Sequence, residues 1–598
     1  MWSRLDGPRP SARPQRGWQP ARAASGAVGL LNGWIDNQAE VAKQLNIVGS
    51  DPSEVYLRAV ERWGDHADAK LTGSYCSIIE LPDGSLRLSR SPWGAPPLLY
   101  ANDTGRAIIA SVPRVLFAAG LVQELDVARF GDSLFFNANM SDEGWFCGTW
   151  RVPQGAIVTL TPGSSRVERW YDPHALAPVR FARDEDYVER AAELVGEAVT
   201  KALAFARKPA MALSGGLDSS IVASQIMRQL PLGQRLMSFT ATPHPDWDGT
   251  VLPAMFGNEQ PWVEAFAAMH PQLDPTFLDW REGGFDDCAD EMFAAMGISP
   301  RNVANSTFNH AVWAAARKAG CDTVFDAEMG NIGYSDDGRW AYVEYFLTGR
   351  WRQLYRTLAA RSEDHRPVWR RIAALSILPL LPRPARRAIR AIVHPELRDN
   401  HRFVSMLRPD AVERLELAER ATPGGLYTGE YSTSREETIR RAYLGADFEN
   451  CEAWQGFEQV HGLIRRDVSA YRPLIEYCLA LPTDQFTRDG EDRRLARRLG
   501  IGRLPEAQRT NRLYGRHNAD WHIRLTRRRA ALRAEAEALR DDPLMSELLD
   551  IDRMQALLDD WPERTPMAAD IAMPREIGLT RAFMAAKFVR HLTGRNLG

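Results

Sequence analysis

One seven-residue segment constrains the fold of this chain more than any other. Ser214-Gly215-Gly216-Leu217-Asp218-Ser219-Ser220 follows the apolar stretch Ala210–Leu213 and precedes the helical pattern Ile221–Leu230. A strand that enters a helix through two glycines places backbone N–H groups at the positive end of the helix dipole, where anions bind. Glycine also lets the main chain approach an anion without a Cβ in the way. The segment therefore predicts an α/β domain with an oxyanion-binding turn.

The polar residues of this turn indicate which anion it binds. Ser214, Ser219 and Ser220 add hydroxyl donors, whereas Asp218 would repel a phosphate unless Mg²⁺ lay between them. The turn lacks the lysine of a GxxxxGK(S/T) loop, which argues against a kinase or a GTPase. It matches the SGG-x-D-S-S signature of the PP-loop ATP pyrophosphatases, which bind pyrophosphate and release AMP. The alternative is an ordinary glycine-rich turn, and seven matching residues disfavour it.

The hydrophobic pattern changes character along the chain. The N-terminal third predicts antiparallel hairpins, for example the strands of Leu71–Leu88 on either side of Pro82-Asp83-Gly84. Pro173 and Pro178 interrupt the pattern, and strands then alternate with helices, which is typical of a parallel sheet. We therefore expect two domains, residues 1–178 and 179–598.

Composition excludes several classes of protein. The 598 residues are 44% hydrophobic and 25% charged, as in globular proteins, and exceed the size of one hydrophobic core. A net charge of -3 gives no general electrostatic reason to bind nucleic acid or an anionic membrane. The six cysteines form no CxxC pair, the N-terminus has no secretory signal, and the apolar run Ile372–Leu381 is too short to span a bilayer. We expect a cytoplasmic protein with reduced thiols and no transmembrane segment.

Several collinear segments resemble the asparagine synthetase family, and the resemblance covers most of the chain. They are Leu31–Asn37, Gly73–Tyr75, Ser91–Tyr100, Met237–Thr240, Asn258-Glu259, Arg466–Arg472 and Arg509–Trp521. The resemblance implies an α/β protein with two parts. The N-terminal part would be a glutaminase-like (Ntn) antiparallel β-sandwich layered domain. The C-terminal part would be a parallel-sheet PP-loop ATP pyrophosphatase domain with helical extensions, using ATP and Mg²⁺.

The N-terminal domain departs from the family at one decisive position. A working glutaminase of this class has a cysteine directly after the initiator Met, because the freed amine activates the thiol. Here Trp2 follows Met1, and the first cysteine is Cys76. We therefore expect no release of ammonia from glutamine. The departure favours relatives that use an amine of the substrate, namely β-lactam synthetases and lasso peptide macrolactam cyclases. The chain length, the Arg- and Trp-rich block with Ala519-Asp520-Trp521 and the Arg466-Asp467 segment resemble the lasso cyclases most.

The resemblance also implies a set of site residues. Phe239 lies in the segment similar to the family's second nucleotide strand, and Glu259 in the segment similar to its acidic pair. Asn331 stands where the family has a metal-binding Asp, and it offers an amide oxygen in place of a carboxylate. The expected ATP-binding residues are Leu213, Ser214, Gly215, Gly216, Asp218, Ser219, Ser220, Phe239 and Glu259, with Asp218 and Asn331 at the metal.

Four residues are candidates for the chemical steps. Glu328 stands where β-lactam synthetase-like enzymes have a catalytic Tyr, so it is a candidate general base, the alternative being a structural carboxylate. The family's lysine before glycine is replaced by Tyr514, and Arg512 or Arg516 could supply the missing cation. Asp467 is the fourth candidate, and its alternative role is an ion pair with Arg466 or Arg472.

The expected function is macrolactam formation on a peptide. An Asp or Glu side chain of a precursor peptide would be adenylated and then attacked by the N-terminal amine of the same peptide. The precursor is the expected partner, with a leader-binding protein and a leader peptidase as further partners. The alternatives are a β-lactam synthetase-like or ammonia-using ligase acting on a small molecule, and a non-catalytic scaffold. The basic stretch Arg370–Arg390 predicts a pair of amphipathic surface helices, with a lid or a docking site for the precursor or a partner protein as the alternative.

Overall fold

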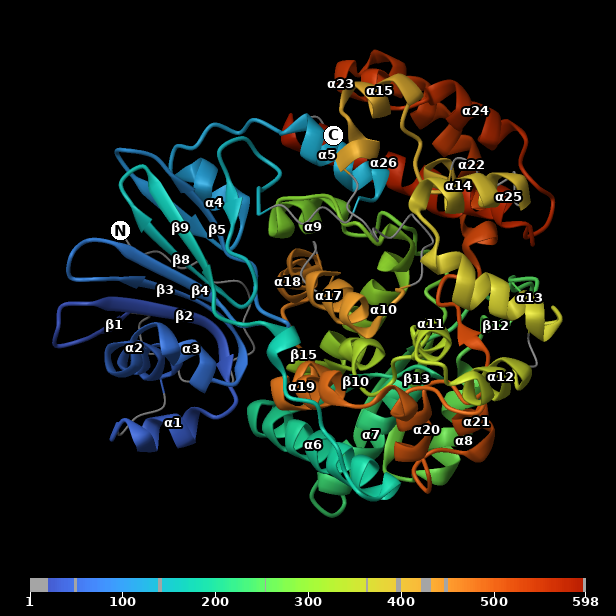
Figure 1. The fold of residues 1–598 in the computed structure, drawn as a ribbon. Helices are drawn as coiled ribbons and strands as arrows, with labels where there is room; N and C mark the ends of the chain where they lie inside the picture. Colours follow the sequence, from blue (N-terminus) through green and yellow to red (C-terminus); the bar gives the residue numbers. More distant parts are fainter. Residues whose placement is uncertain are drawn as a thin grey trace.

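Two β-sheets with different strand arrangements organise the chain (Figure 1). The computed structural model describes residues 20–47, 51–137, 142–252, 254–361, 364–393, 400–420, 432–445 and 450–594. Met1 and Trp2, on which the expectation of an inactive glutaminase rests, lie outside the described residues.

The N-terminal sheet is antiparallel, as its hairpin signals predict. Its six strands follow the order β1 (Ala21–Arg22), β2 (Val28–Ile35), β3 (Gly73–Glu80), β4 (Leu86–Arg90), β8 (Ala156–Thr161) and β9 (Ser164–Arg169). The turn between β3 and β4 forms as expected, because Asp83 accepts a hydrogen bond from Ser85 N and Gly84 takes a φ of 82°. A second sheet has the order β6 (Ala107–Ala110), β5 (Leu99–Asn102) and β7 (Trp150–Arg151).

Helices complete the N-terminal part. They are α1 (Gln38–Gln44), α2 (Pro52–Trp63), α3 (Ala67–Lys70), α4 (Pro113–Ala118) and α5 (Val127–Phe135). Helix α2 buries Val55, Leu57 and Ala59 in the same hydrophobic cluster as Leu31 of β2. The antiparallel sheet and its helices therefore share a core of their own.

The C-terminal sheet is parallel, as the alternation of strands and helices predicts. Its order is β13 (Leu273–Leu278), β11 (Leu236–Ala241), β10 (Pro209–Ala212), β14 (Thr323–Asp326) and β15 (Ile464–Asp467). From β10 the strands continue outward on one side through β11 and β13, and on the other side through β14 and β15, so the order reverses between β10 and β14. Ligands bind at such a switch point, beyond the carboxyl ends of the strands. Strands β12 (Met255–Phe256) and β16 (Tyr514–Gly515) form a separate short parallel pair.

Helices cover both faces of this sheet. Neighbouring residues of β10 belong to different hydrophobic clusters, because side chains alternate along a strand. Met211 lies in one cluster with Leu217 and Phe266, and Ala210 lies in another with Trp313 and Phe457. The helices are α6 (Asp184–Phe205), α7 (Leu217–Gln229), α8 (Gln260–Met269), α9 (Ala289–Met296), α10 (Ser306–Lys318), α11 (Ala341–Leu347), α12 (Trp351–Ala359), α13 (Val368–Ile372), α14 (Arg383–Val393), α15 (Pro409–Arg414), α16 (Leu417–Arg420), α17 (Arg435–Gly445), α18 (Asn450–His461), α19 (Arg472–Ala480), α20 (Arg494–Leu499), α21 (Glu506–Thr510), α22 (Trp521–Ala538), α23 (Pro543–Leu548), α24 (Ile551–Asp559), α25 (Ala569–Met573) and α26 (Thr580–Leu592).

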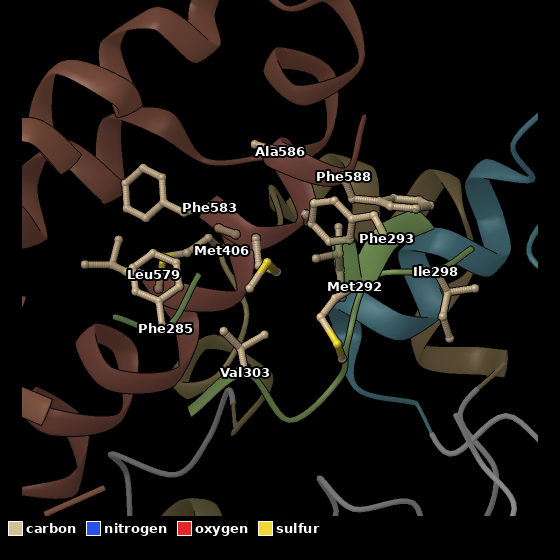
Figure 2. Packing of buried hydrophobic residues seen from close by; sticks show 14 of the residues in the cluster. Phe285, Met292, Phe293, Ile298, Val303, Met406, Leu579, Phe583, Ala586 and Phe588 are labelled. Carbon is tan, nitrogen blue, oxygen red and sulfur yellow. The ribbon is translucent and has the colours of Figure 1, made fainter. Parts of the chain in front are cut away.

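The C-terminal helices form the expected helical extension. Figure 2 shows part of the hydrophobic core that these helices share, with the side chains of Phe293 (α9), Phe588 (α26) and Met406. Phe130 of α5 joins the same cluster, so the extension packs against the N-terminal part. The fold class predicted from the sequence is thus confirmed, while the domain boundary at residue 178 stays a prediction. No helix in the described ranges is both long and apolar enough to cross a membrane.

Candidate functional site

The predicted oxyanion turn lies where β10 gives way to α7. Ser214 Oγ and Ser219 Oγ are 2.8 Å apart, and Gly216 N donates to Ser214 Oγ at 3.2 Å. Leu213 N donates to Phe239 O of β11 at 3.1 Å, which fixes the start of the turn against the neighbouring strand. The two hydroxyls and the strand pairing therefore hold the turn in one conformation.

A carboxylate already occupies one N–H group of the turn. Gly215 N donates to Glu259, which the chain places just before α8. A Cβ on Gly215 would lie 2.7 Å from Trp262 Cβ, so only glycine fits this position. Burial raises the pKa of Glu259, while His517 Nδ1, at 3.5 Å from its Oε1, acts against this. The turn thus donates an N–H to a carboxyl oxygen in this structure.

Gln508 supports the turn from the opposite side, and sequence reasoning missed it. This buried residue of α21 donates from Nε2 to Gly215 O at 3.1 Å and to Ser220 Oγ at 2.8 Å. Gln508 thus ties the carbonyl side of the turn to α21 and leaves the N–H of Gly215 to its carboxylate partner. No local motif marks this glutamine, since the contact joins residues 293 apart in sequence.

Asp218, in the first turn of α7, has the features of a cation ligand. Its Oδ1 is buried and has no hydrogen-bond partner of normal geometry in the described part of the chain. Burial raises the pKa of Asp218, while Arg493 Nη2, at 3.6 Å from Oδ2, acts against this. A Cβ on Gly330 would lie 2.5 Å from Oδ1, so a glycine is required beside the carboxylate. An unpaired, buried carboxylate oxygen fits Mg²⁺, which proteins hold through one or two carboxylates together with phosphate oxygens.

The second expected metal ligand, Asn331, is engaged by a guanidinium. Arg493 Nη2 donates to Asn331 Oδ1 at 2.5 Å, and Arg493 Nε donates to Ser335 O at 3.1 Å. The same guanidinium lies 5.9 Å from the ring centre of Tyr514, the residue that replaces the family's lysine. Among the described residues, no group of three or more His, Cys, Asp or Glu side chains could hold a metal. Asp218 is therefore the better supported of the two ligands.

Arg493 is the cation that the structure places beside Asp218, and sequence reasoning missed it. It adopts a φ of 50°, a left-handed conformation that costs a non-glycine residue free energy and often marks a functional site. The expected cations are engaged elsewhere: Arg512 Nη1 donates to Ala360 O at 3.3 Å, and Arg516 pairs with Glu576. Arginines crowd this part of the sequence, so no local signal distinguishes the one that reaches Asp218.

Three carboxylates converge on one arginine at the ends of β14 and β15. Arg465 Nη2 lies 2.9 Å from Asp326 Oδ1, 2.6 Å from Glu328 Oε2 and 3.6 Å from Asp467 Oδ2. Burial, opposed by Arg465 and reinforced by Asp467, raises the pKa of Asp326 to about 7. Trp454 Nε1 also donates to Glu328 Oε2 at 2.8 Å. The cluster carries more negative than positive charge and can accept a proton near neutral pH.

Asp467 also holds the loop that carries Glu328. Its Oδ2 accepts a hydrogen bond from Met329 N at 2.8 Å, and its Oδ1 accepts one from Ser469 N at 2.9 Å. The alternative expected from the sequence, an ion pair with Arg466 or Arg472, is wrong. Arg466 pairs with Asp36 of the N-terminal part, and Arg472 pairs with Glu476.

These features define a class of protein, an α/β fold with a glycine-rich turn between a parallel strand and a helix and a carboxylate with a buried oxygen, that of Asp218, in the first turn of that helix. Residues 190–575 match the profile of the asparagine synthase family, and residues 12–171 match that of a glutamine amidotransferase domain. The chain belongs to the asparagine synthase family, whose members are ATP-dependent ligases and generally use ATP with Mg²⁺.

Similarity to individual proteins is weaker and partial. A Mycobacterium tuberculosis protein provisionally named asparagine synthetase (glutamine-hydrolyzing) is 24% identical over 244 residues, or 38% of this chain and 37% of the relative. Amidase chry2 from Gibberella zeae is 23% identical over 235 residues, or 38% of this chain and 34% of that protein. The chain thus spans little more than a third of either relative. A solved glutamine phosphoribosylpyrophosphate amidotransferase from B. subtilis aligns with 38% of this chain and 57% of its own, at 11% identity and a TM-score of 0.19.

Proposed function

We propose that this chain is an AMP-forming carbon–nitrogen ligase that closes a macrolactam ring in a precursor peptide, as lasso peptide cyclases do. It would activate an Asp or Glu side chain of the peptide and join it to the peptide's N-terminal amine. The observation that carries the proposal is that one strand-to-helix turn combines the unpaired Oδ1 of Asp218 with an N–H, that of Gly215, which already binds a carboxyl oxygen. Together these groups could bind a nucleoside triphosphate and its metal ion.

The nucleotide would bind at the carboxyl ends of β10 and β11. The N–H groups of Gly215 and Gly216 and the hydroxyls of Ser214, Ser219 and Ser220 would bind the phosphate oxygens that leave as pyrophosphate. Glu259 would leave the N–H of Gly215 when phosphate enters. Asp218 would hold Mg²⁺, which when bound neutralises phosphate charge. The backbone of β11 around Phe239 would border the adenine.

The reaction would then proceed in two displacements. The substrate carboxylate attacks the α-phosphorus of ATP, pyrophosphate leaves, and an acyl-adenylate forms. The substrate amine attacks the acyl carbon, AMP leaves, and the amine proton passes to a base. Arg493 would stabilise negative charge in the first displacement, and its position 3.6 Å from Asp218 supports this role. Glu328 would receive the proton in the second, and it shares Arg465 with Asp326, whose pKa burial raises to about 7.

The amine would come from the substrate and not from glutamine. In the described N-terminal part, Cys76 is buried in β3, and burial raises the pKa of its thiol to about 11. A thiol in this state is a poor nucleophile. This supports an internal amine, and positioning it against the activated carboxyl would be the enzyme's main contribution. A leader-binding protein and a leader peptidase would prepare the precursor.

Product analysis tests the proposal. The protein would be incubated with ATP, Mg²⁺ and synthetic peptides that carry a free N-terminus and one Asp or Glu. We expect AMP, pyrophosphate and a product lighter than the peptide by one water, whereas ADP and phosphate would refute the assignment. Turnover with a small amino acid but with none of the peptides would favour a β-lactam synthetase-like or ammonia-using ligase.

Two substitutions test the proposed catalytic site, and a nucleotide-binding assay tests the alternative of a non-catalytic scaffold. Asp218→Asn should abolish AMP formation, and Arg493→Met should lower kcat by about 10²–10³, the usual effect of removing one group that stabilises transition-state charge. Arg533→Met is the matched control, because Arg533 of α22 pairs with Asp559 and its side chain is 59% exposed. A non-hydrolysable ATP analogue should bind the wild type in a Mg²⁺-dependent manner. If it does not bind, the proposed ATP site is refuted; if it binds but no substrate yields AMP, the protein is a non-catalytic scaffold.

A further inference from the structure

Residues 368–393 carry an unusual local charge. They contain six arginines and no Asp, Glu or Lys, although the whole chain has a net charge of -3. The segment covers α13, α14 and the residues that join them. In α14, Ala385, Ile389 and Ile392 recur at helical spacing, and the arginines fall between them. The overall charge of the protein therefore conceals a basic, amphipathic segment.

Large apolar side chains on these helices are exposed. The exposed fraction is 64% for Trp369, 78% for Ile392 and 62% for Val393. The preceding helix, α12, adds Trp351 at 55% and Tyr355 at 59%, which lie one helical turn apart. Helices α12 and α13 lie at the outer edge of the molecule in Figure 1. Exposed aromatic side chains thus lie on α12 and α13, and exposed aliphatic ones at the end of α14; we term these three helices the α12–α14 surface.

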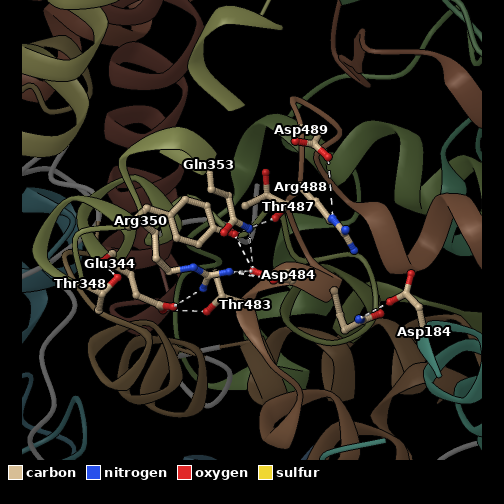
Figure 3. Close-up of polar contacts among 12 residues, drawn as sticks. Asp184, Glu344, Thr348, Arg350, Gln353, Thr483, Asp484, Thr487, Arg488 and Asp489 are labelled. Atoms are coloured by element: carbon tan, nitrogen blue, oxygen red, sulfur yellow. Dashed lines mark hydrogen bonds and ion pairs between the residues drawn. The ribbon is translucent and has the colours of Figure 1, made fainter. Parts of the chain in front are cut away.

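The inner side of α12 is firmly anchored. Leu354 and Leu358 pack with Tyr345 of α11 in one buried cluster. Just before the helix, Arg350 Nη2 lies 2.8 Å from Asp484 Oδ2, and Gln353 donates to Asp484 Oδ1 at 3.0 Å (Figure 3). The exposed residues of α12 therefore stand on a well-fixed helix.

The arginines on the outer side lack such partners. In the ranges that the structure describes, no carboxylate lies within ion-pair distance of Arg352, Arg356 or Arg370. Arg352 and Arg356 alternate with Trp351 and Tyr355 along the exposed side of α12. The surface therefore offers unneutralised guanidinium groups beside aromatic rings.

We propose that the α12–α14 surface binds the face of an anionic lipid bilayer. Helices that lie in a membrane interface combine arginines for the headgroups with Trp, Ile and Leu for the acyl region. Trp and Tyr favour the headgroup level, because their rings are apolar with one polar atom. The arginines alone would also suit nucleic acid, but exposed Ile392 and Val393 have no counterpart in a phosphate backbone. The exposed aliphatic residues therefore favour the lipid.

Vesicle sedimentation tests this surface independently of catalysis. The full chain should bind phosphatidylcholine vesicles that contain phosphatidylglycerol, bind phosphatidylcholine alone far less, and dissociate in high salt. Arg352→Gln with Arg356→Gln should weaken binding about 30-fold, because each arginine near an anionic surface contributes about 1 kcal/mol. Trp369→Ser should weaken it about tenfold.

Matched variants keep the test specific. Leu232→Ser removes a fully exposed apolar side chain outside this surface, and Arg509→Gln removes a paired arginine. Both should bind vesicles like the wild type, and far-ultraviolet circular dichroism should show every variant folded. Three results would overturn the proposal: no vesicle binding by the wild type, equal binding to neutral and anionic vesicles, or unchanged binding by the surface variants. If the surface variants lost binding to a peptide or an oligonucleotide but kept vesicle binding, the surface would be assigned to that other partner and the proposal would be overturned.

Discussion

Two buried histidines should make the stability of this protein sensitive to acid. His310 of α10 and His461 of α18 share a hydrogen bond between Nδ1 and Nε2 at 2.9 Å. Burial, with the nearby His461 charge, lowers the pKa of His310 from 6.5 to about 3. Burial, with Arg317, lowers the pKa of His461 to about 4. Both rings are therefore neutral in the folded protein over a range where the unfolded chain takes up protons.

The direction and size of the effect follow from these pKa values. The contribution of these two neutral histidines to the free energy of unfolding is fully present above pH 6.5. It is lost as the pH falls from there toward their pKa values in the folded protein. At pH 5, proton uptake stabilises the unfolded state by about 2 kcal/mol per histidine, or about 4 kcal/mol for the pair. For a chain of this length that unfolds as one unit, the loss corresponds to about 3 °C in Tm, and to more if one domain melts alone.

A double variant isolates this contribution. His310→Leu combined with His461→Leu removes both polar rings, whereas a single substitution would leave a buried nitrogen without its partner. Scanning calorimetry would compare the Tm drop between pH 7 and pH 5 in both proteins, with exposed His174→Gln as the control. Buried Asp336 and Glu576, whose pKa values burial raises to about 7, act in the opposite direction but equally in both proteins. The reasoning fails if the double variant loses as much Tm as the wild type.

Three further predictions concern the N-terminal part. Gly33→Ala should lower the free energy of unfolding by several kcal/mol, measured by urea titration, because a Cβ there would lie 2.1 Å from Ser74 O at a φ of 113°. Cys76 should resist iodoacetamide at pH 8 in the native protein and react in urea, and native labelling would contradict its raised pKa of about 11. Asp36→Asn should destabilise by about 3–5 kcal/mol, since it leaves the guanidinium of Arg466 buried without its charge partner. Adding Arg466→Met should recover part of that loss, and a purely additive double variant would argue against the pair.

Some residues of the proposed site can be predicted from the sequence, whereas the contacts of others cannot. The turn from Ser214 to Ser220 is recognisable because each of its requirements is local: a strand, two glycines, hydroxyls and a helix start. The loop of Glu328 and Asn331 was found through family resemblance, but its contacts were not. Asn331 binds Arg493, and Glu328 joins Arg465 and Trp454, partners more than a hundred residues away in sequence. The roles of all these residues stay predictions.

The sequence by itself determined the two sheet types, the oxyanion turn and the family, because alternation, periodicity and glycine placement act over a few neighbouring residues. Only the tertiary structure decided which of many arginines reaches Asp218, which carboxylates share Arg465 and which amide supports the turn. These choices depend on strands β10, β14 and β15 lying side by side and on later segments folding back over their ends. Such contacts come from the packing of the whole chain, which short-range patterns do not encode.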